Sequence, residues 1–246
     1  MSEPKIIAEN KGLIAIYKPA GLIVHSDGRT VEPSLANWLL EKYRELEGVG
    51  EPWVSPQGES IAVAGIVHRL DRSTSGVMLV GKTPRTFAYL KNEFKERRVE
   101  KLYHALVYGH MEEDEGEIVA EIMRTSEVPK KWYARPTEVS DPRAAITKWE
   151  VLRRFTDEHG EKVTYVEMRP VTGRTHQIRV HFASIGHPLI ADHLYAADRA
   201  PLFGFKRPAL HAESISVTLP DGKKQTYSAP IPDDFHVALL ADELYS

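Results

Sequence analysis

Short apolar segments of the kind found in β-strands are the feature of this 246-residue sequence that most limits its fold. Many of them follow one another without a helix between them, and only three stretches have helical spacing. Consecutive strands favour a mixed or largely antiparallel sheet, so the sequence predicts an α+β fold. The predicted strands are residues 13–17, 22–24, 61–67, 77–80, 99–108, 146–152, 163–168, 215–219 and 225–227.

The three helical stretches begin at residues that can cap a helix. Ser34 is the predicted cap of a helix that reaches Gly48, and Thr83 is the predicted cap of the next. Thr175 is predicted to cap a short third helix that ends at Gly186. We expect one domain over residues 1–246, with a core from about residue 11 to residue 230.

The composition excludes several kinds of protein. Without cysteine the chain has no disulfides, thiolate nucleophiles or cysteine-ligated zinc, which suits the cytoplasm. It has no apolar signal core, and no apolar run approaches the ~20 residues that cross a bilayer. With a net charge of −3, a nucleic-acid partner has to be argued from local clusters, either as a binding surface or as ordinary solvated faces. The main basic cluster is Lys82, Arg85, Lys91, Lys95, Arg97, Arg98 and Lys101.

Asp71 is the most informative acidic residue. It follows an apolar segment, stands between two arginines and precedes small hydroxyl residues and a glycine, a pattern typical of a polar turn. Such an aspartate can be a catalytic group, or it can simply cap the turn through the amides of Ser73 or Thr74. The local pattern leaves both interpretations open.

A second polar cluster, residues 172–181, lies at the start of the predicted third helix. Arginines beside the free amides of a helix N-terminus favour an anion site, although these arginines can also pair with surface acids. The histidines of this region lack the partners of a usual zinc site, so no metal is expected. They are His176, His181, His187 and His193.

The order of the motifs resembles the RluA class of pseudouridine synthases over residues 11 to about 218. Two motifs carry most of the resemblance: His68-Arg69-Leu70-Asp71 with Thr74-Ser75-Gly76, and Gly173 to His181 with Gly186-His187-Pro188. Further matches are Lys18-Pro19-Ala20-Gly21, Val24-His25, Tyr103 before His104-Ala105, and Leu210-His211-Ala212.

The resemblance implies a pseudouridine synthase fold, in which helices and loops flank a mixed, largely antiparallel sheet with a central catalytic cleft. It implies that Asp71 is catalytic, that Tyr103 and Arg179 complete the active site, and that Arg69 enters the RNA helix where the uridine leaves. No cofactor is expected, because the isomerisation involves no redox change. The other residues expected to bind substrate are His68, Arg72, Arg174, His176, Gln177 and Ile178, with Lys95 and Arg98 on the phosphates.

The implied chemistry breaks the uridine bond from N1 to C1′ and joins C5 to C1′. Asp71 can serve as a nucleophile or as a base that removes a sugar proton, and either route needs an ionised carboxylate. A guanidinium within ~4–6 Å favours that form, so a pair with Arg179 is expected. A stacked base cannot be reached, so the uridine must be flipped out, and Tyr103 offers a ring on which it can stack.

Two departures from the family pattern concern turn geometry: Tyr17-Lys18-Pro19 and Ala191-Asp192. Many relatives also carry an N-terminal S4-like domain, which we expect to be absent here. We therefore expect a single catalytic domain that acts as a monomer and binds ribosomal or transfer RNA by itself. The alternatives are an inactive RNA-binding protein of the same fold and a glycoside hydrolase. A hydrolase would need a second carboxylate ~5–9.5 Å from Asp71.

Overall fold

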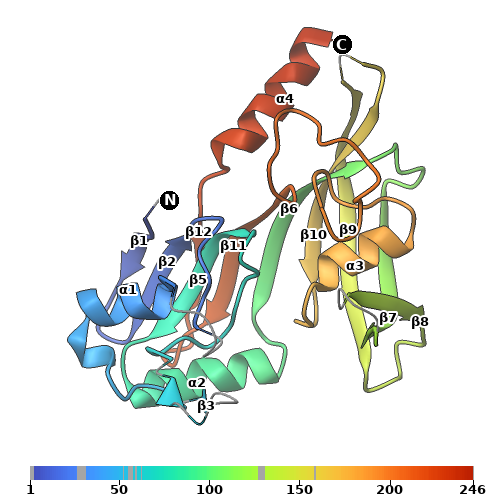
Figure 1. The fold of residues 1–246 in the computed structure, drawn as a ribbon. Helices are drawn as coiled ribbons and strands as arrows, with labels where there is room; N and C mark the ends of the chain where they lie inside the picture. Colours follow the sequence, from blue (N-terminus) through green and yellow to red (C-terminus); the bar gives the residue numbers. More distant parts are fainter. Residues whose placement is uncertain are drawn as a thin grey trace. The chain divides into compact units, whose positions relative to one another are not determined.

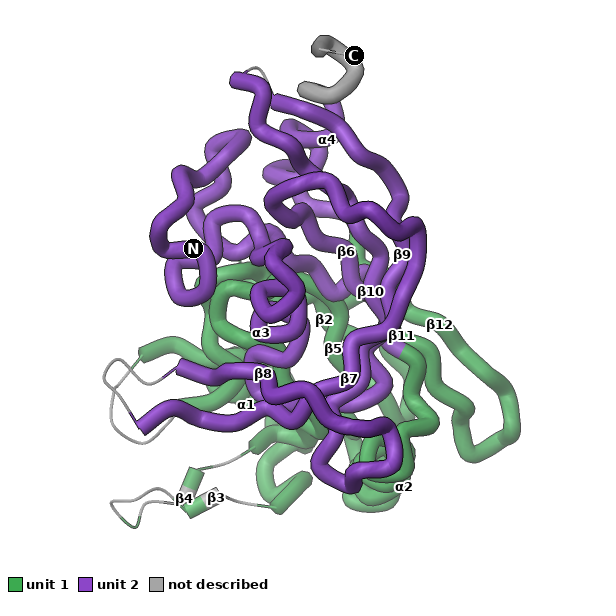
Figure 2. The backbone as a smooth tube through the Cα atoms, turned by 90° about the vertical axis from the view of Figure 1, so that its right-hand side faces the viewer, with its two compact units in different colours: residues 1–100, 214–230 green, residues 101–213, 231–246 purple. Residues whose placement is uncertain are grey.

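The computed structural model describes residues 3–26, 32–51, 53–54, 58, 60–61, 63–126, 131–157 and 159–245. The chain divides into two compact units, coloured separately in Figure 2. Unit 1 comprises residues 1–100 and 214–230, and unit 2 comprises residues 101–213 and 231–246. The expectation of a single catalytic domain stays a prediction. Within the described residues, no helix combines the length and the apolar character that a membrane span needs.

Unit 1 is built on three antiparallel strands: β1 (Lys5–Glu9), β2 (Leu13–Lys18) and β5 (Ser75–Gly81). It also contains the end of β11 (Leu210–Thr218), which forms an antiparallel hairpin with β12 (Lys224–Ser228). This hairpin turns at Asp221-Gly222, as predicted, and Gly222 has a φ of +82°. Two short strands, β3 (Trp53–Val54) and β4 (Ser60–Ile61), pair with each other. The apolar side chains of the three strands and of the hairpin share one core.

Both helices of unit 1 begin at the predicted caps. The Ser34 hydroxyl accepts the N–H of Asn37 in α1 (Leu35–Lys42), and the Thr83 hydroxyl accepts the N–H of Thr86 in α2 (Pro84–Lys95). The first helix is shorter than expected, because it ends at Tyr43 and a 3-10 turn, η1 (Arg44–Leu46), follows.

Two predicted strands of unit 1 are wrong. Residues 22–24 form no strand, because the carbonyls of Ile23 and Val24 accept the N–H groups of the first residues of α1. Residues 61–67 turn at Ala64 and Gly65, with φ values of 47° and 70°. A side chain at Gly65 would meet the carbonyl of Gly81 at 2.1 Å, so close backbone contact replaces strand pairing there.

Unit 2 is built on antiparallel strands in the order β6, β10, β9, β7, β8 (Figure 1). Helix α3 (Gln177–Ser184) packs against β7, β8 and β9, and α4 (Asp233–Tyr245) contacts β9. The predicted strands at 99–108, 146–152 and 163–168 are confirmed, whereas β1, β7, β8 and α4 were not predicted. The strand bounds are β6 (Glu100–Tyr108), β7 (Glu115–Arg124), β8 (Trp132–Pro136), β9 (Ala144–Thr156) and β10 (Lys162–Pro170).

The sheet of unit 2 is buried on both faces. Along β6, Ala105 and Val107 join a core that includes Ile178 and Phe182 of α3, whereas Leu106 and Tyr108 join a second core that includes Phe235 of α4. Side chains of one strand that alternate between two cores show that both faces of the sheet are covered at β6. A largely antiparallel sheet packed with helices confirms the predicted α+β class.

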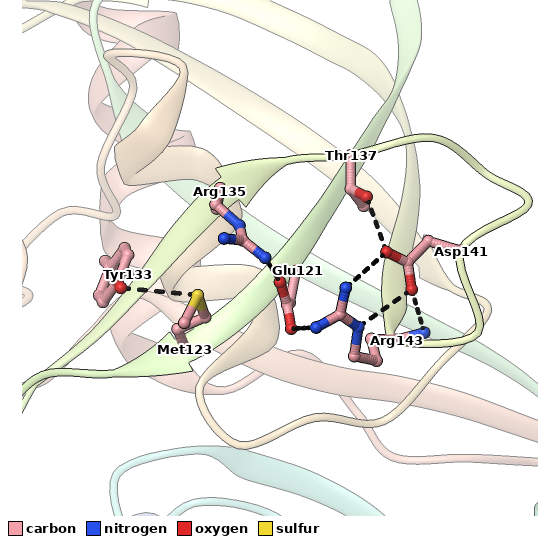
Figure 3. A network of polar contacts seen from close by, with 7 residues as sticks. All are labelled: Glu121, Met123, Tyr133, Arg135, Thr137, Asp141 and Arg143. Atoms are coloured by element: carbon pink, nitrogen blue, oxygen red, sulfur yellow. Dashed lines mark hydrogen bonds and ion pairs between the residues drawn. The ribbon is translucent and has the colours of Figure 1, made fainter.

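A polar network fixes the free edge of this sheet (Figure 3). Glu121 of β7 is 8% exposed and accepts from Arg135 of β8 and from Arg143, 3.0 Å away. Arg143 also pairs with Asp141, which lowers the pKa of that carboxyl to about 2. The network therefore ties the loop before β9 to the β7–β8 hairpin.

Candidate active site

Asp71 lies in a tight turn of unit 1, directly before β5. The N–H of Thr74 donates to the backbone carbonyl of Asp71 at 3.1 Å, so the backbone closes the turn at this amide. The N–H of Gly21, at a φ of +91°, donates to the carbonyl of Arg72 at 2.8 Å. The Asp71 turn is thus attached to the turn that follows β2.

Lys18, at the end of β2, strengthens this attachment. Its side chain is fully buried, with 0% exposure, and its ammonium donates to three backbone carbonyls. These are Pro19 and Leu22, both at 2.9 Å, and Arg72 at 3.3 Å. The Lys-Pro-Ala-Gly motif therefore holds the backbone of the Asp71 turn from inside unit 1.

The other residues of the first motif have separate surroundings. The His68 ring stacks on Phe94 with centroids 4.4 Å apart, and its Nε2 accepts the N–H of Leu79 at 2.9 Å. Arg72 forms a bidentate ion pair with Glu32 at 2.6 and 2.7 Å, and Arg69 is exposed. His68 therefore packs within unit 1, and Arg69 offers its side chain to solvent.

The basic cluster lies only in part on a helix. α2 ends at Lys95, because Arg97 adopts a φ of 58° and the N–H groups of Arg97 and Arg98 bond back to Phe94 and Glu93. Arg98 also pairs with Glu93 at 2.6 Å, and Lys91 pairs with Glu51. Lys95 is exposed at the helix end.

In unit 2, the second motif begins α3, but its first turn differs from the prediction. The N-terminal cap residue is His176, at a φ of 54°, and not Thr175. The Gln177 side chain, 4% exposed, accepts from the N–H of Arg174 at 3.0 Å and from the Thr172 hydroxyl at 2.7 Å. Its amide nitrogen donates to Ile146 O and Thr147 Oγ1, both at 3.0 Å. Gln177 therefore holds the segment that precedes the helix against the start of β9, while Arg174 is exposed.

Arg179 is the most enclosed arginine of the motif, at 3% exposure. Its Nε and Nη2 donate to the two carboxylate oxygens of Asp192 at 2.7 and 2.8 Å. Asp192 is itself fully buried and also accepts the N–H of Leu194 at 3.0 Å. This bidentate geometry fixes the plane of the guanidinium.

Tyr103 lies half-buried on β6, opposite Met168 of β10. It packs against the core that contains Ile178 and Phe182. The fold of unit 2 therefore brings Tyr103 and α3 to the same face of the sheet, although α3 lies 74 to 81 positions further along the chain, beyond the reach of any local sequence signal.

Comparisons with known proteins identify the family to which this fold belongs. The sequence profile of the RNA pseudouridylate synthase family matches residues 12–184. The chain belongs to this family. Its matched span includes Asp71, Tyr103 and Arg179 and ends before Asp192.

Individual relatives span most of the chain. The dual-specificity RNA pseudouridine synthase RluA of Vibrio parahaemolyticus is 34% identical over 94% of this chain and 84% of its own length. The ribosomal large subunit pseudouridine synthase D of Nitrosomonas europaea is 36% identical over 96% of this chain and 64% of its own length. The solved human RNA pseudouridylate synthase domain containing 1 superposes with a TM-score of 0.70 at 25% identity, covering 94% of this chain and 84% of that one. The predicted family, fold and enzyme class, an RNA-modifying isomerase, are confirmed.

Three residues beside the family motifs were not predicted to matter for the site. Asp192 was considered only as a feature of a turn, Tyr195 was not considered, and Lys18 was noted as part of a family motif and of a departure from it, without a role in the site. A fully buried lysine and a fully buried aspartate are rare unless each has partners, but burial cannot be read from residue type. The proline and glycine after Lys18 were the one available signal of its turn.

Proposed function

We propose that this synthase converts specific uridines of ribosomal or transfer RNA to pseudouridine, with Asp71, Tyr103 and Arg179 as its catalytic residues. The observation that carries the proposal is the turn of Asp71, whose backbone is held by Lys18 and Gly21 next to a motif that matches the family. Rigid support of a reacting group lowers the entropic cost of reaching the transition state.

The role proposed for Asp71 is to act at C1′, as nucleophile or as base, while the bond to N1 breaks. The uracil then turns and C5 joins C1′, which returns Asp71 to the free carboxylate. The C5 proton leaves and N1 takes up a proton, so the product is an isomer of uridine. Tyr103 would stack on the flipped base and Arg179 would supply a fixed positive charge. These three roles rest on the family resemblance, and the chemistry of each side chain suits them.

The names of the relatives support the choice of substrate, because one is described as dual-specificity and another as acting on the large ribosomal subunit. We propose that exposed cations position the RNA through its phosphates, which carry no sequence information. The cations proposed for this role are Arg69, Arg72, Arg174, Lys95 and Arg98. We further propose that the enzyme works as a monomer in the cytoplasm.

The test begins by mapping pseudouridines in RNA from cells with and without the gene. A transcript that spans the mapped uridine, carrying tritium at uracil C5, then reports turnover by tritium release. Asp71→Asn should abolish release while RNA affinity stays within a few-fold of wild type, because charge is lost and volume is not. Asp221→Asn, in another turn of unit 1, is the matched control and should remain active. A tenth of the wild-type rate in Asp71→Asn would contradict the proposal.

A further inference from the structure

Tyr195 lies at the centre of the contacts around Arg179 in unit 2. The Arg179 guanidinium carbon is 5.1 Å from the centroid of the Tyr195 ring, within the range of cation–π contact. The Tyr195 hydroxyl is 2.9 Å from Nδ1 of His176 and accepts the N–H of Trp132, on β8, at 3.3 Å. Tyr195 therefore links Arg179 to the start of α3 and to the edge strand of the sheet.

The ring and Asp192 constrain Arg179 in different directions. The two hydrogen bonds from Asp192 fix the guanidinium within its own plane. They leave it able to tilt about the line that joins the two groups. The Tyr195 ring opposes that tilt, because the cation is attracted to the face of the ring. Asp192 also fixes the backbone turn that leads to Tyr195, because its carboxylate accepts the N–H of Tyr195 at 3.3 Å.

The hydroxyl of Tyr195 has a structural role that is separate from the role of its ring. It accepts the N–H of Trp132 and also lies within hydrogen-bond distance of Nδ1 of His176, 2.9 Å away. His176 has a left-handed backbone, at a φ of 54°, and begins the helix that carries Arg179. Holding this strained residue from outside the helix stabilises the helix start.

We propose that Tyr195 is a positioning residue for Arg179: its ring orients the guanidinium, and its hydroxyl holds the start of α3. This inference rests on the proposed function, in which Arg179 is catalytic. The ring and the hydroxyl of Tyr195 have separable effects. Loss of the ring slows the reaction, and loss of the hydroxyl alone lowers the stability of the protein.

The same unit offers a close match for a control. Tyr165 and His104 form a second tyrosine–histidine pair, with the hydroxyl 2.6 Å from Nδ1 and the rings at 82°. The corresponding interplanar angle of Tyr195 and His176 is 85°. Tyr165 belongs to the core on the α4 side of the sheet, whereas Tyr195 contacts Arg179. Substitutions at Tyr165 therefore show how much stability the protein loses when a tyrosine of such a pair is replaced away from Arg179.

The experiment compares Tyr195→Phe, Tyr195→Leu, Tyr165→Phe and Tyr165→Leu, with Arg179→Lys as the reference for a displaced charge. Each variant is assayed for single-turnover tritium release from the mapped transcript at saturating enzyme, for RNA dissociation constant and for melting temperature. Tyr195→Leu should slow release about 30-fold or more, since small displacements of a catalytic group can cost 10²-fold. Its RNA affinity should stay within about threefold of wild type.

Tyr195→Phe should keep the rate within about threefold of wild type, because the ring remains, and should lower the melting temperature. Both Tyr165 variants should lower the melting temperature without slowing the bound complex. The inference is overturned if Tyr195→Leu retains a near wild-type rate, or if Tyr165→Leu slows release equally. Should Tyr195→Leu fail to fold, Tyr195→Met, whose longer and unbranched side chain adapts more easily to the space, is held to the same prediction.

The design separates this inference from the proposed function. An active Asp71→Asn would refute the catalytic proposal whatever Tyr195 does. A fully active Arg179→Lys would refute the role of Tyr195 while leaving that of Asp71 intact.

Discussion

The two units support their motifs in different ways. In unit 1, the buried ammonium of Lys18 donates to backbone carbonyls, one of which belongs to Arg72 beside Asp71. In unit 2, the buried carboxylate of Asp192 binds the side chain of Arg179. A cation among carbonyl dipoles fixes a backbone turn, whereas an ion pair fixes one side chain. Each kind of support therefore matches the group that it holds: the backbone of the Asp71 turn in unit 1 and the Arg179 guanidinium in unit 2.

The largest effect is expected from removing the buried anion. Asp192→Ala leaves the Arg179 guanidinium buried without its carboxylate, and breaking a buried pair in this way costs about 3–5 kcal/mol. Chemical denaturation should show a loss of that size in the free energy of unfolding. Asp141→Ala removes a carboxylate from a similar but exposed arginine, Arg143, and should cost much less because water screens that pair. Equal losses would show that burial is not what makes the Asp192 pair important.

A smaller effect is expected from removing the buried cation. Lys18→Met keeps most of the volume but leaves carbonyls of unit 1 without their donor, at about 1–3 kcal/mol for a buried unsatisfied group. Because methionine also removes the free-energy cost of burying an ammonium, we expect the free energy of unfolding to fall by about 2 kcal/mol. Lys11→Met, at an exposed position of the same unit, should change stability by less than about 0.5 kcal/mol. A Lys18→Met protein as stable as wild type would refute the supporting role of Lys18.

A third prediction concerns a buried histidine on the same helix as Arg179. Burial lowers the pKa of His181 from 6.5 to about 4. Its Nδ1 bonds to Thr147 Oγ1, and no partner for its Nε2 is found among the residues that the structure describes. Between these two pKa values the unfolded chain binds the extra proton, so stability falls as the pH is lowered through that window.

The contribution of His181 within the window is about 1.4 kcal/mol per pH unit. Denaturation at pH 6.5, 5.5 and 4.5 should therefore show a shallower pH dependence in His181→Gln than in wild type. His193→Gln, at an exposed position of unit 2, should keep the wild-type dependence. Identical slopes for wild type and His181→Gln would contradict the prediction.

The smallest effect is expected from one strained residue in each unit. Arg97 of unit 1 and Ala191 of unit 2 have φ values of 58° and 57°, a conformation that costs a side-chain-bearing residue roughly 1–2 kcal/mol. Arg97→Gly and Ala191→Gly should each raise the free energy of unfolding by about 1 kcal/mol, reduced by the entropy that glycine gains when unfolded. Ala183→Gly, inside α3, is the opposite control and should destabilise. A destabilised Ala191→Gly protein would mean that the methyl group packs more favourably than the backbone is strained.

By itself the sequence determined the elements whose signals are local. The caps at Ser34 and Thr83, the hairpin at Asp221-Gly222 and the alternation of the long strands each depend on neighbours within a few residues. The family motifs are equally local, which is why Asp71, Tyr103 and Arg179 could be proposed as catalytic residues without any structure.

Only the tertiary structure decided how these elements and residues are supported. The segment 61–67 has the composition of a strand, yet close contact between Gly65 and Gly81 turns it. Asp192 and Tyr195 contact Arg179 from outside the helix, and Lys18 reaches the carbonyl of a residue 54 positions along the chain. The choice of partner for a buried charge depends on which groups packing brings within hydrogen-bond distance, and no periodicity or capping pattern encodes that distance.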